Sequence, residues 1–408
     1  MAERPKLAAH KWLFPARIRP NAFSWKSSRV AVERVREAVA EILAVARRDP
    51  VTAAEGAVGL IERLSPALEH VDSSSGSLGN AVNGAIEALV PVIAAAPVAT
   101  NIREKWLKRL FEAHEADGVP YIEILTDYWG ELCVTKELAS AWADGLVGIT
   151  SMSLSPDRSL RGHYHGTTAC LDALLYAGRY VELYELLRVE KFWSYKRWAV
   201  KALAAEGKAD AAIALAEASR GQWTSDRDVN QLCEGILLSA GRFEEAYRRY
   251  GLYAHRAGTY LATFRAVAKA YPSIPRDRIL SDLIEASPGD EGKWFATAKE
   301  LKLYAVALEL AGQSPCDPKT LARAAHDFAE REPVFARGAG FAALRWLSLG
   351  HGYEISSLDV WGAYHSTLKA ADKLGSMAET KEAIRQLVAQ QPGSGFVRQV
   401  LGRELGLT

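Results

Sequence analysis

The segment from residue 70 to residue 80 carries the polar side chains best suited to bind an anion. It places a run of small hydroxyl residues directly before an apolar helical pattern that begins near Leu78. Free amides at a helix N-terminus carry partial positive charge, so such a loop can receive an anion. Simple helix capping by Ser75 or Ser77 accounts for the same residues and is the interpretation we favour. The candidate anion-binding residues are Ser73, Ser74, Ser75, Gly76 and Ser77.

The same segment lacks the established motifs of nucleotide binding and of nucleophilic catalysis. The Gly-Lys-Ser/Thr ending of a P-loop is missing. No Gly-x-Ser-x-Gly turn supports a catalytic triad built from the loop serines with His70 and Asp72. We therefore assign no catalytic residue, and an uncharacterised enzyme that uses residues 70–80 is the third of three functional hypotheses.

His163, His165 and Cys170 offer metal-compatible atoms within one short stretch. In an extended chain, side chains two positions apart share a face, so this spacing can bring at most two imidazoles together. A structural zinc site also needs four convergent ligands. We expect no metal site here and no bound cofactor.

An aromatic and basic stretch at residues 191–198 is the best candidate for a partner-binding surface. On a helix, Tyr195 and Trp198 are three positions apart and share a face. Such rings can anchor a peptide while the cations contact its carboxylates, or can stack on single-stranded nucleic acid. The competing interpretation is that the rings fill space between consecutive helices. The partner-binding candidates are Trp193, Tyr195, Lys196, Arg197 and Trp198, together with Lys293 and Trp294 farther along the chain.

The hydrophobic pattern that must position these residues is helical almost throughout. From Val30 onward, apolar residues recur at spacings of three and four, and short Pro- or Gly-containing breaks separate the helical stretches. Alternating patterns typical of β-strands are not evident. The sequence predicts an all-α protein, specifically an α-solenoid of antiparallel helical hairpins.

Internal similarity indicates that the hairpins repeat. The segment from Gly178 to Tyr184 (Gly-Arg-Tyr-Val-Glu-Leu-Tyr) returns as Gly-Arg-Phe-Glu-Glu-Ala-Tyr at residues 241–247, sixty-three positions later. Residues 206–212 occupy the intermediate place, and residues 301–307 continue the phase without a glycine. We expect each glycine to end one helix in a left-handed turn, and Tyr180, Phe243 or Leu303 to pack as the next helix begins.

This punctuation resembles the junction between the two helices of a tetratricopeptide repeat over roughly residues 165–315, although the full consensus is absent. Residues 30–150 lack the punctuation, and their long Ala- and Val-rich helices are more similar to HEAT or armadillo pairs. Three segments, residues 66–76, 291–295 and 401–405, resemble an uncharacterised bacterial family of helical proteins described as a domain of unknown function. That resemblance implies a bacterial cytosolic protein and carries over no functional residue.

We expect three regions along the chain. A basic, aromatic N-terminal arm covers residues 1–29, a HEAT- or armadillo-like domain covers residues 30–155, and a tetratricopeptide-like domain with a C-terminal cap covers residues 156–408. The second boundary rests on a cluster of Ser, Pro, Asp and Gly near residues 150–164, which is typical of a linker.

The composition of the 408-residue chain excludes several classes of protein. Its 50 basic and 49 acidic residues give a net charge of +1, so binding to nucleic acid or to an anionic membrane would need a local patch. Four isolated cysteines within helical patterns are typical of buried, reduced thiols in a cytoplasmic protein. The longest nearly apolar run, residues 88–99, is shorter than a membrane span, and we expect no membrane segment.

These observations lead to a primary hypothesis and a competing one. The primary hypothesis is a non-enzymatic scaffold that binds a protein or peptide in the groove of its helical repeats, by analogy with that architecture. The competing hypothesis is nucleic-acid binding. It rests on cations in the arm and in the aromatic stretch: Arg4, Lys6, Lys11, Arg17, Arg19, Lys26, Arg29, Lys191, Lys196 and Arg197.

Overall fold

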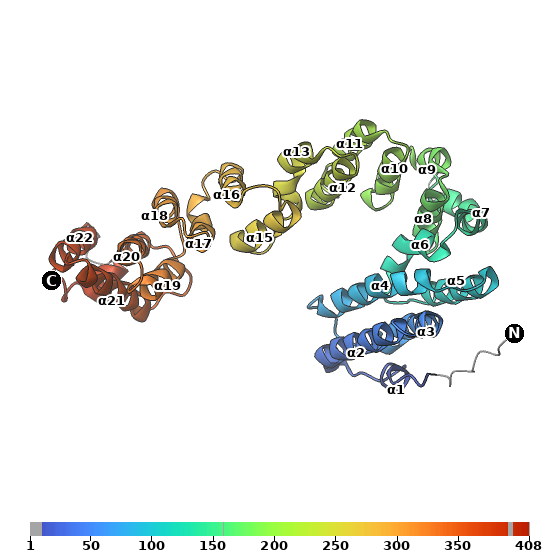
Figure 1. Cartoon of the computed structure of the whole chain (residues 1–408), viewed down its shortest axis with the longest axis horizontal. Helices are drawn as coiled ribbons and strands as arrows, with labels where there is room; N and C mark the ends of the chain where they lie inside the picture. Colours follow the sequence, from blue (N-terminus) through green and yellow to red (C-terminus); the bar gives the residue numbers. More distant parts are fainter. Residues whose placement is uncertain (1–9, 158, 391–394, 408) are drawn as a thin grey trace. The chain divides into compact units, whose positions relative to one another are not determined.

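The computed structural model describes residues 10–157, 159–390 and 395–407, and within these ranges the fold is all-α, without a β-strand. The predicted all-α class is therefore confirmed. The chain divides into two compact units, residues 1–224 and residues 225–408. Figure 1 shows each unit as a succession of helices in which a helix lies beside helices close to it in sequence.

The first unit begins with a layer of long helices. Within it α2, α3 and α4 pack on one another, and α5 packs on α3. Farther along, α7 packs on α8, α9 on α10 and α10 on α11. The helices are α1 (Phe14–Arg17), α2 (Ser28–Ala46), α3 (Pro50–Leu68), α4 (Ser77–Ala95), α5 (Thr100–Glu115), α6 (Trp129–Cys133), α7 (Lys136–Ser153), α8 (Thr167–Ala177), α9 (Tyr180–Leu187), α10 (Trp193–Ala205) and α11 (Ala209–Glu217), with 3₁₀ turns η1 (Trp25–Ser27) and η2 (Glu123–Tyr128).

The second unit continues with shorter helices that again contact their neighbours along the chain. The densest packing joins α19 to α20 and α20 to α21. The elements are α12 (Asp226–Ser239), α13 (Phe243–Ala246), the π-helical turn η3 (Tyr247–Gly251), α14 (Leu252–Ala254), α15 (Tyr260–Ala270), α16 (Arg276–Glu285), the 3₁₀ turn η4 (Glu291–Trp294), α17 (Phe295–Glu300), α18 (Tyr304–Gln313), α19 (Pro318–Phe328), α20 (Pro333–Ser348), α21 (Ser357–Lys373), α22 (Met377–Ala389) and α23 (Phe396–Leu401). Packing of this nearest-neighbour kind is what a helical solenoid requires.

Helix α4 is the one described helix that is long and apolar enough to cross a membrane. Its apolar face, including Val82, Ile86 and Leu89, is buried against α2 and α3. The buried guanidinium of Arg103 donates hydrogen bonds to the carbonyls of Ile93, Ala94 and Ala96, which lie at the C-terminal end of α4. The guanidinium thus supplies donors to carbonyls at the end of the helix, where intrahelical donors run out. The packing accounts for the apolar composition of α4 as that of a core helix.

The described part of the N-terminal arm packs on the first helices. Phe14 and Ile18 are buried in the first core, and the ring of Trp12 lies so close to Gly56 of α3 that a Cβ atom would overlap it. The backbone amide of Leu13 donates to Glu41 of α2 at 2.8 Å. Of the arm cations proposed for nucleic-acid binding, Arg17 pairs with Glu37, whereas Arg4 and Lys6 lie outside the described residues.

The glycine turns form as the sequence predicts. Gly178, Gly207 and Gly241 have φ of 80°, 80° and 73°, and each follows the first helix of a hairpin. After Gly178, the amide of Arg179 donates to the carbonyl of Leu174 at 3.0 Å. The same bond recurs after Gly207 and after Gly241. This pairing closes the helix and lets the next helix begin two residues after the glycine.

The fourth turn has the expected geometry in a different register. Lys302, with φ of 61°, occupies the left-handed position, and the amide of Leu303 donates to Ala298. Tyr304 rather than Leu303 is therefore the first residue of α18, and its ring packs on Phe328 and Phe335. The register predicted for Leu303 is wrong by one residue because no glycine marks the turn in the sequence. A further turn of this kind, at Gly375, joins α21 to α22.

The division between the compact units lies near residue 224 and not near residue 155. Helices α7 and α8 flank the expected boundary and pack along each other. Across it, the hydroxyls of Ser153 and Thr167 lie 3.3 Å apart in the interior. The polar connection near residues 150–164 is thus the loop of a packed hairpin. A loop composition typical of linkers does not by itself show a domain boundary. The four cysteines are buried and form no disulfide.

Two glycines at α12 provide a matched test of the left-handed turn. Changing Gly241 to Ala should lower the free energy of unfolding by about 1–2 kcal/mol, because a Cβ atom is strained at positive φ. Changing Gly235 to Ala, inside the exposed face of the same helix, should raise it by up to about 1 kcal/mol. Neither added methyl meets another atom within 4 Å. Chemical denaturation of the two variants measures both changes, and a stabilised Gly241→Ala variant would contradict the turn.

Candidate ligand-binding site

The aromatic and basic stretch at residues 191–198 forms part of the first unit's interior. Trp193 and Trp198 are buried, and Tyr195, Lys196 and Arg197 are half-buried. Arg197 donates two hydrogen bonds to the carboxylate of Asp127, at 2.7 and 2.8 Å. The two indoles therefore fill space between α10 and the preceding hairpin, and Tyr195, Lys196 and Arg197 stay a prediction for partner binding.

A half-buried, poorly solvated carboxylate lies close to this stretch. Asp172 of α8 accepts a hydrogen bond from the backbone amide of Gly130 at 2.7 Å. Burial raises the pKa of Asp172 to about 7. Burial also lowers the pKa of Lys201, whose ammonium nitrogen lies 3.8 Å from the centroid of the Trp198 ring. The charged side chains of Asp172 and Lys201 thus contact groups of the protein itself.

Hydrogen bonds within the serine loop before α4 join several of its polar groups, although no side chain caps the helix. The backbone amide of Ser74 donates to the Asp72 carboxylate at 3.0 Å. The hydroxyls of Ser75 and Ser77 lie 2.8 Å apart, and Ser75 also accepts from the amide of Ser77. Gly76, at φ of 70°, is the N-cap residue. A carboxylate already occupies this loop, which is a poor arrangement for a second anion. Ser73, Ser74, Ser75, Gly76 and Ser77 are all exposed.

The histidines at 163 and 165 lie beside a third histidine that the sequence pattern did not bring forward. His114 is buried, and its Nε2 atom lies 3.0 Å from the carbonyl of His165. Burial lowers the pKa of His114, which disfavours its charged form. Within the described ranges, no three His, Cys, Asp or Glu side chains are arranged to hold a metal ion.

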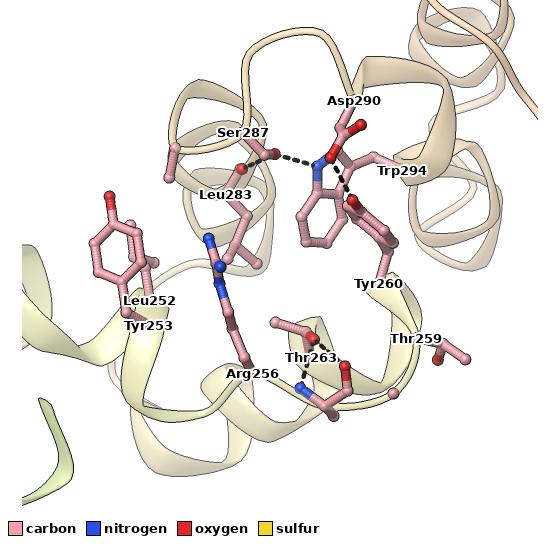
Figure 2. Close-up of a pocket in the computed structure, with 13 residues that line it drawn as sticks. Leu252, Tyr253, Arg256, Thr259, Tyr260, Thr263, Leu283, Ser287, Asp290 and Trp294 are labelled. Atoms are coloured by element: carbon pink, nitrogen blue, oxygen red, sulfur yellow. Dashed lines mark hydrogen bonds between the residues drawn. The ribbon is translucent and has the colours of Figure 1, made fainter. Parts of the chain in front are cut away.

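Lys293 and Trp294 lead to a cavity of about 210 Å³ in the second unit, which we call the Arg256 pocket (Figure 2). Trp294 is buried and forms one wall, whereas Lys293 is exposed beside it. The pocket lies where the loop after α14 meets the loop after α16. It is lined by Leu252, Tyr253, Arg256, Ala257, Gly258, Thr259, Tyr260, Thr263, Leu283, Ala286, Ser287, Asp290 and Trp294.

Most polar side chains of the Arg256 pocket already have protein partners. The indole of Trp294 donates to the hydroxyl of Ser287 at 2.8 Å, and Ser287 donates to the carbonyl of Leu283 at 2.7 Å. The hydroxyl of Tyr260 donates to one oxygen of Asp290, and the ammonium of Lys293 lies 2.8 Å from the other. These contacts lower the pKa of Asp290, with Lys293 the larger cause. Asp290 is therefore ionised, and both of its carboxylate oxygens have partners.

Arg256 differs from the other charged groups in the pocket. Figure 2 shows its side chain extending from the loop toward Leu283, between Tyr253 on one side and Tyr260 with Trp294 on the other. Its guanidinium carbon lies 5.4 Å from the centroid of the Tyr253 ring. Across the described residues it forms no ion pair. The pocket thus presents a cation with unused hydrogen-bond donors.

The loop that carries Arg256 is fixed by buried polar contacts. The preceding residue, His255, contacts the carboxylate of Glu234 at 2.9 Å, and Tyr271 donates to the same carboxylate. On the other side, the amide of Ala257 donates to Thr263 at 2.9 Å. The π-helical turn ends at Gly251, where a Cβ atom would lie 2.7 Å from the Tyr271 ring. This close approach lets Tyr271 pack under the loop.

Two open grooves lie farther along the second unit. The first, of about 380 Å³, is the Phe328 groove, lined by Leu261, Ala296, Lys299, Glu300, Lys302, Tyr304, Phe328 and Arg331. The second, of about 290 Å³, is the α19–α21 groove, lined by Lys319, Ala322, Arg323, His326, Leu358, Asp359, Gly362 and Ser366. The Arg256 pocket and the Phe328 groove share the first turn of α15, and both grooves use α19.

The acidic residues of these grooves are engaged, whereas most of their cations are not. Arg265 donates to Glu300 at 3.0 Å, and Asp359 accepts from the amide and hydroxyl of Ser356 in a capping box. The cations of the Phe328 groove, Lys299, Lys302 and Arg331, have no carboxylate partner within the part of the chain that the structure describes. Both grooves therefore present net positive charge over apolar side chains.

Comparisons of the chain with models of protein families, with curated proteins and with solved structures found no match. The function must be argued from the geometry of the site itself.

The sequence pattern pointed to one edge of the Arg256 pocket and missed its centre. Lys293 and Trp294 were candidates because a cation adjoins a large ring, but Arg256, Tyr260 and Asp290 were not. The only local signal was the Pro-Gly-Asp break at residues 288–290, three residues before Lys293. The absence of a counterion at Arg256 is a property of the folded chain, which no short motif reveals.

The poorly solvated carboxylate of Asp172 predicts a pH dependence of stability. Its folded pKa, about 7, lies above the ordinary value of 3.8, so the folded protein binds this proton more tightly than the unfolded chain. The stability that the protonated Asp172 contributes to the folded state is fully present below about pH 4 and is lost as the pH rises to about 7. Asp172→Asn should remove that loss.

Urea denaturation at pH 5 and pH 8 measures this effect. The decline in midpoint between the two values should be smaller for Asp172→Asn than for the unchanged protein. Glu104→Gln, on the exposed face of α5, is the control and should leave the decline as it is. An identical decline in all three proteins would contradict the assignment.

The hydrogen bond from Tyr271 to Glu234, which fixes the loop that carries Arg256, gives a second prediction about stability. Tyr271→Phe removes a hydroxyl that donates to the buried Glu234 carboxylate, so the free energy of unfolding should fall by about 1.5–3 kcal/mol. Tyr253→Phe, in the wall of the Arg256 pocket, removes the hydroxyl of a half-buried residue and should change stability by less than about 0.5 kcal/mol. Denaturation curves of both variants test the difference, and equal effects would exclude the proposed role of Tyr271.

Proposed function

We propose that the protein is a non-enzymatic helical-repeat scaffold whose second unit binds an acidic segment of a partner protein. The observation that carries the proposal is the shared charge pattern of the three cavities: their acids are engaged by the fold, and most of their cations are not. An extended acidic peptide with apolar side chains complements such cavities, since its carboxylates meet the cations and its apolar groups meet the cavity walls.

The rings and exposed apolar groups of the grooves support a peptide of mixed character. Lys299 and Arg331 lie 6.0 and 5.1 Å from the centroid of the Phe328 ring. Leu358, at the edge of the α19–α21 groove, is 82% exposed. An exposed leucine beside cations is a suitable anchor for an apolar side chain of a partner.

Nucleic acid is the competing partner, because cations beside aromatic rings also bind phosphates and bases. Two observations favour a peptide. The carboxylates of Asp290, Glu300 and Asp359 line the cavities and would repel a continuous phosphate backbone. The rings of Tyr304 and Phe328 contact each other and are half-buried, so neither stands free for a base to stack on.

The proposal extends to the cellular setting. Four buried thiols without a disulfide support a reducing compartment such as the bacterial cytoplasm. The resemblance of residues 66–76, 291–295 and 401–405 to a bacterial family of unknown function supports the same setting. The tetratricopeptide-like turns support membership of the helical-repeat class, whose members bind extended segments along their repeats.

Removing the cations of the Phe328 groove tests the proposed function. The combined change of Lys299, Lys302 and Arg331 to Ser should weaken binding of a fluorescent twelve-residue peptide of alternating Glu and Leu by about tenfold. Three exposed ion pairs of about 0.5 kcal/mol each account for that factor. Fluorescence anisotropy at low salt measures the affinity, and added salt should reduce it.

The control removes the same charge from the exposed surface of the first unit. Lys26, Arg47 and Lys105, changed together to Ser, should leave the affinity unchanged. A peptide of alternating Lys and Leu should bind neither protein. Binding of a single-stranded dT oligonucleotide in preference to the acidic peptide would overturn the proposal in favour of the nucleic-acid hypothesis.

A further inference from the structure

The Arg256 pocket is smaller than the two grooves, and hydrogen bonds between its lining side chains define its walls. Its lining therefore restricts the chemistry of a ligand more than the grooves do. Its volume of about 210 Å³ is far larger than one water molecule requires and lies below the range usual for drug-sized ligands. It suits a group of about the size of one amino-acid residue.

The polar side chains of the pocket leave one charged group for a ligand. The Asp290 carboxylate is held by Tyr260 and Lys293, Ser287 is held between Trp294 and the Leu283 carbonyl, and Thr263 holds Ala257. Arg256 alone among the charged lining side chains has no ion pair in the described ranges. A guanidinium offers donors in a fixed fork that matches a carboxylate.

The remaining lining is apolar on the side toward which Arg256 extends. Leu252 and Leu283 are buried, and Ala286 and the Tyr253 ring are half-buried. In Figure 2 the guanidinium points toward Leu283, and the Tyr253 ring lies to one side of it, 5.4 Å from the guanidinium carbon. A bound molecule would therefore place an anionic group on Arg256 and a small apolar group against Leu252 and Leu283.

The charge balance favours a carboxylate over a phosphate. A phosphate carries more negative charge and is usually held by several donors or cations. Here a single arginine faces the cavity, and the ionised Asp290 lies on the opposite wall. One positive charge beside a fixed negative charge matches a monoanion.

We propose that the Arg256 pocket binds a carboxylate that bears a small apolar group. Two sources have this chemistry: the C-terminal residue of a peptide, and a free small carboxylic acid. The peptide form rests on the proposed function, because the segment in the neighbouring Phe328 groove would end in this pocket. The free-acid form does not depend on that function.

Two pairs of probes separate the sources. The first pair is the Glu-Leu peptide of twelve residues that ends in Leu, made with a free C-terminal carboxylate and with a C-terminal amide. The second pair is N-acetyl-leucine and its amide. Binding of the peptides is measured by anisotropy, and binding of the small molecules by calorimetry or by NMR, with the full chain in each case.

The free acid of each pair should bind at least about tenfold more tightly than its amide, as loss of a charge-assisted hydrogen bond predicts. Arg256→Gln should abolish this preference, and Arg256→Lys should restore only part of it because an ammonium lacks the planar fork. Ala286→Leu, which fills the apolar part, should weaken both acids while Arg256 remains. Arg227→Gln, an exposed arginine of α12, is the control and should have no effect.

The outcomes distinguish this inference from the proposed function. If the peptide acid and amide bind equally well and Arg256→Gln changes neither, and N-acetyl-leucine does not bind, the carboxylate site is wrong while the groove proposal stands. If N-acetyl-leucine binds through Arg256 but no acidic peptide binds, the site holds a free acid and the scaffold proposal fails. If no probe binds to folded protein, both proposals fail.

Discussion

The left-handed turn that closes the first helix of successive hairpins is the constraint on which much of the structure depends. At Gly178, Gly207, Gly241 and Lys302, one residue at positive φ lets two backbone amides satisfy carbonyls at the helix end, and the second helix begins two residues later. This fixes the direction of the returning helix. Within each unit, helices close in sequence then pack on one another, as α8, α9, α10 and α11 do in the first unit.

The sequence allows this local geometry to be predicted because its signals are local. A helical period and a glycine that tolerates positive φ predict the all-α class and three of the turns. The register at Lys302 could not be predicted in the same way, since a lysine gives no sign that it will adopt φ of 61°. The aromatic stretch around Trp198 shows a second limit. Periodicity places rings on one face of a helix but does not say whether another helix covers that face.

The sequence predicts only two residues at the edge of the candidate site, Lys293 and Trp294. Its lining comes from two loops about thirty residues apart, Tyr253 to Tyr260 and Ala286 to Trp294, and they meet because α15 and α16 fold back on each other. The π-helical turn before the pocket, and the approach of Tyr271 to Gly251, have no periodic signature. The function of Arg256 depends on which neighbours are already paired, and that can be decided only after every hydrogen bond around it is placed.

Arg103, Arg197 and Arg256 differ in what satisfies their guanidinium groups, and this difference is the physical basis for placing ligand binding at Arg256. In the first unit, Arg103 is satisfied by carbonyls at the end of α4, and Arg197 by Asp127. Both hold helices together, and removing either would leave buried groups without partners. In the Arg256 pocket the carboxylate that could have paired with the arginine is instead held by Tyr260 and Lys293. Arg256 is solvent-exposed and acts on Asp290 only through its charge, without an ion pair, so its donors remain open to an external carboxylate beside the apolar walls.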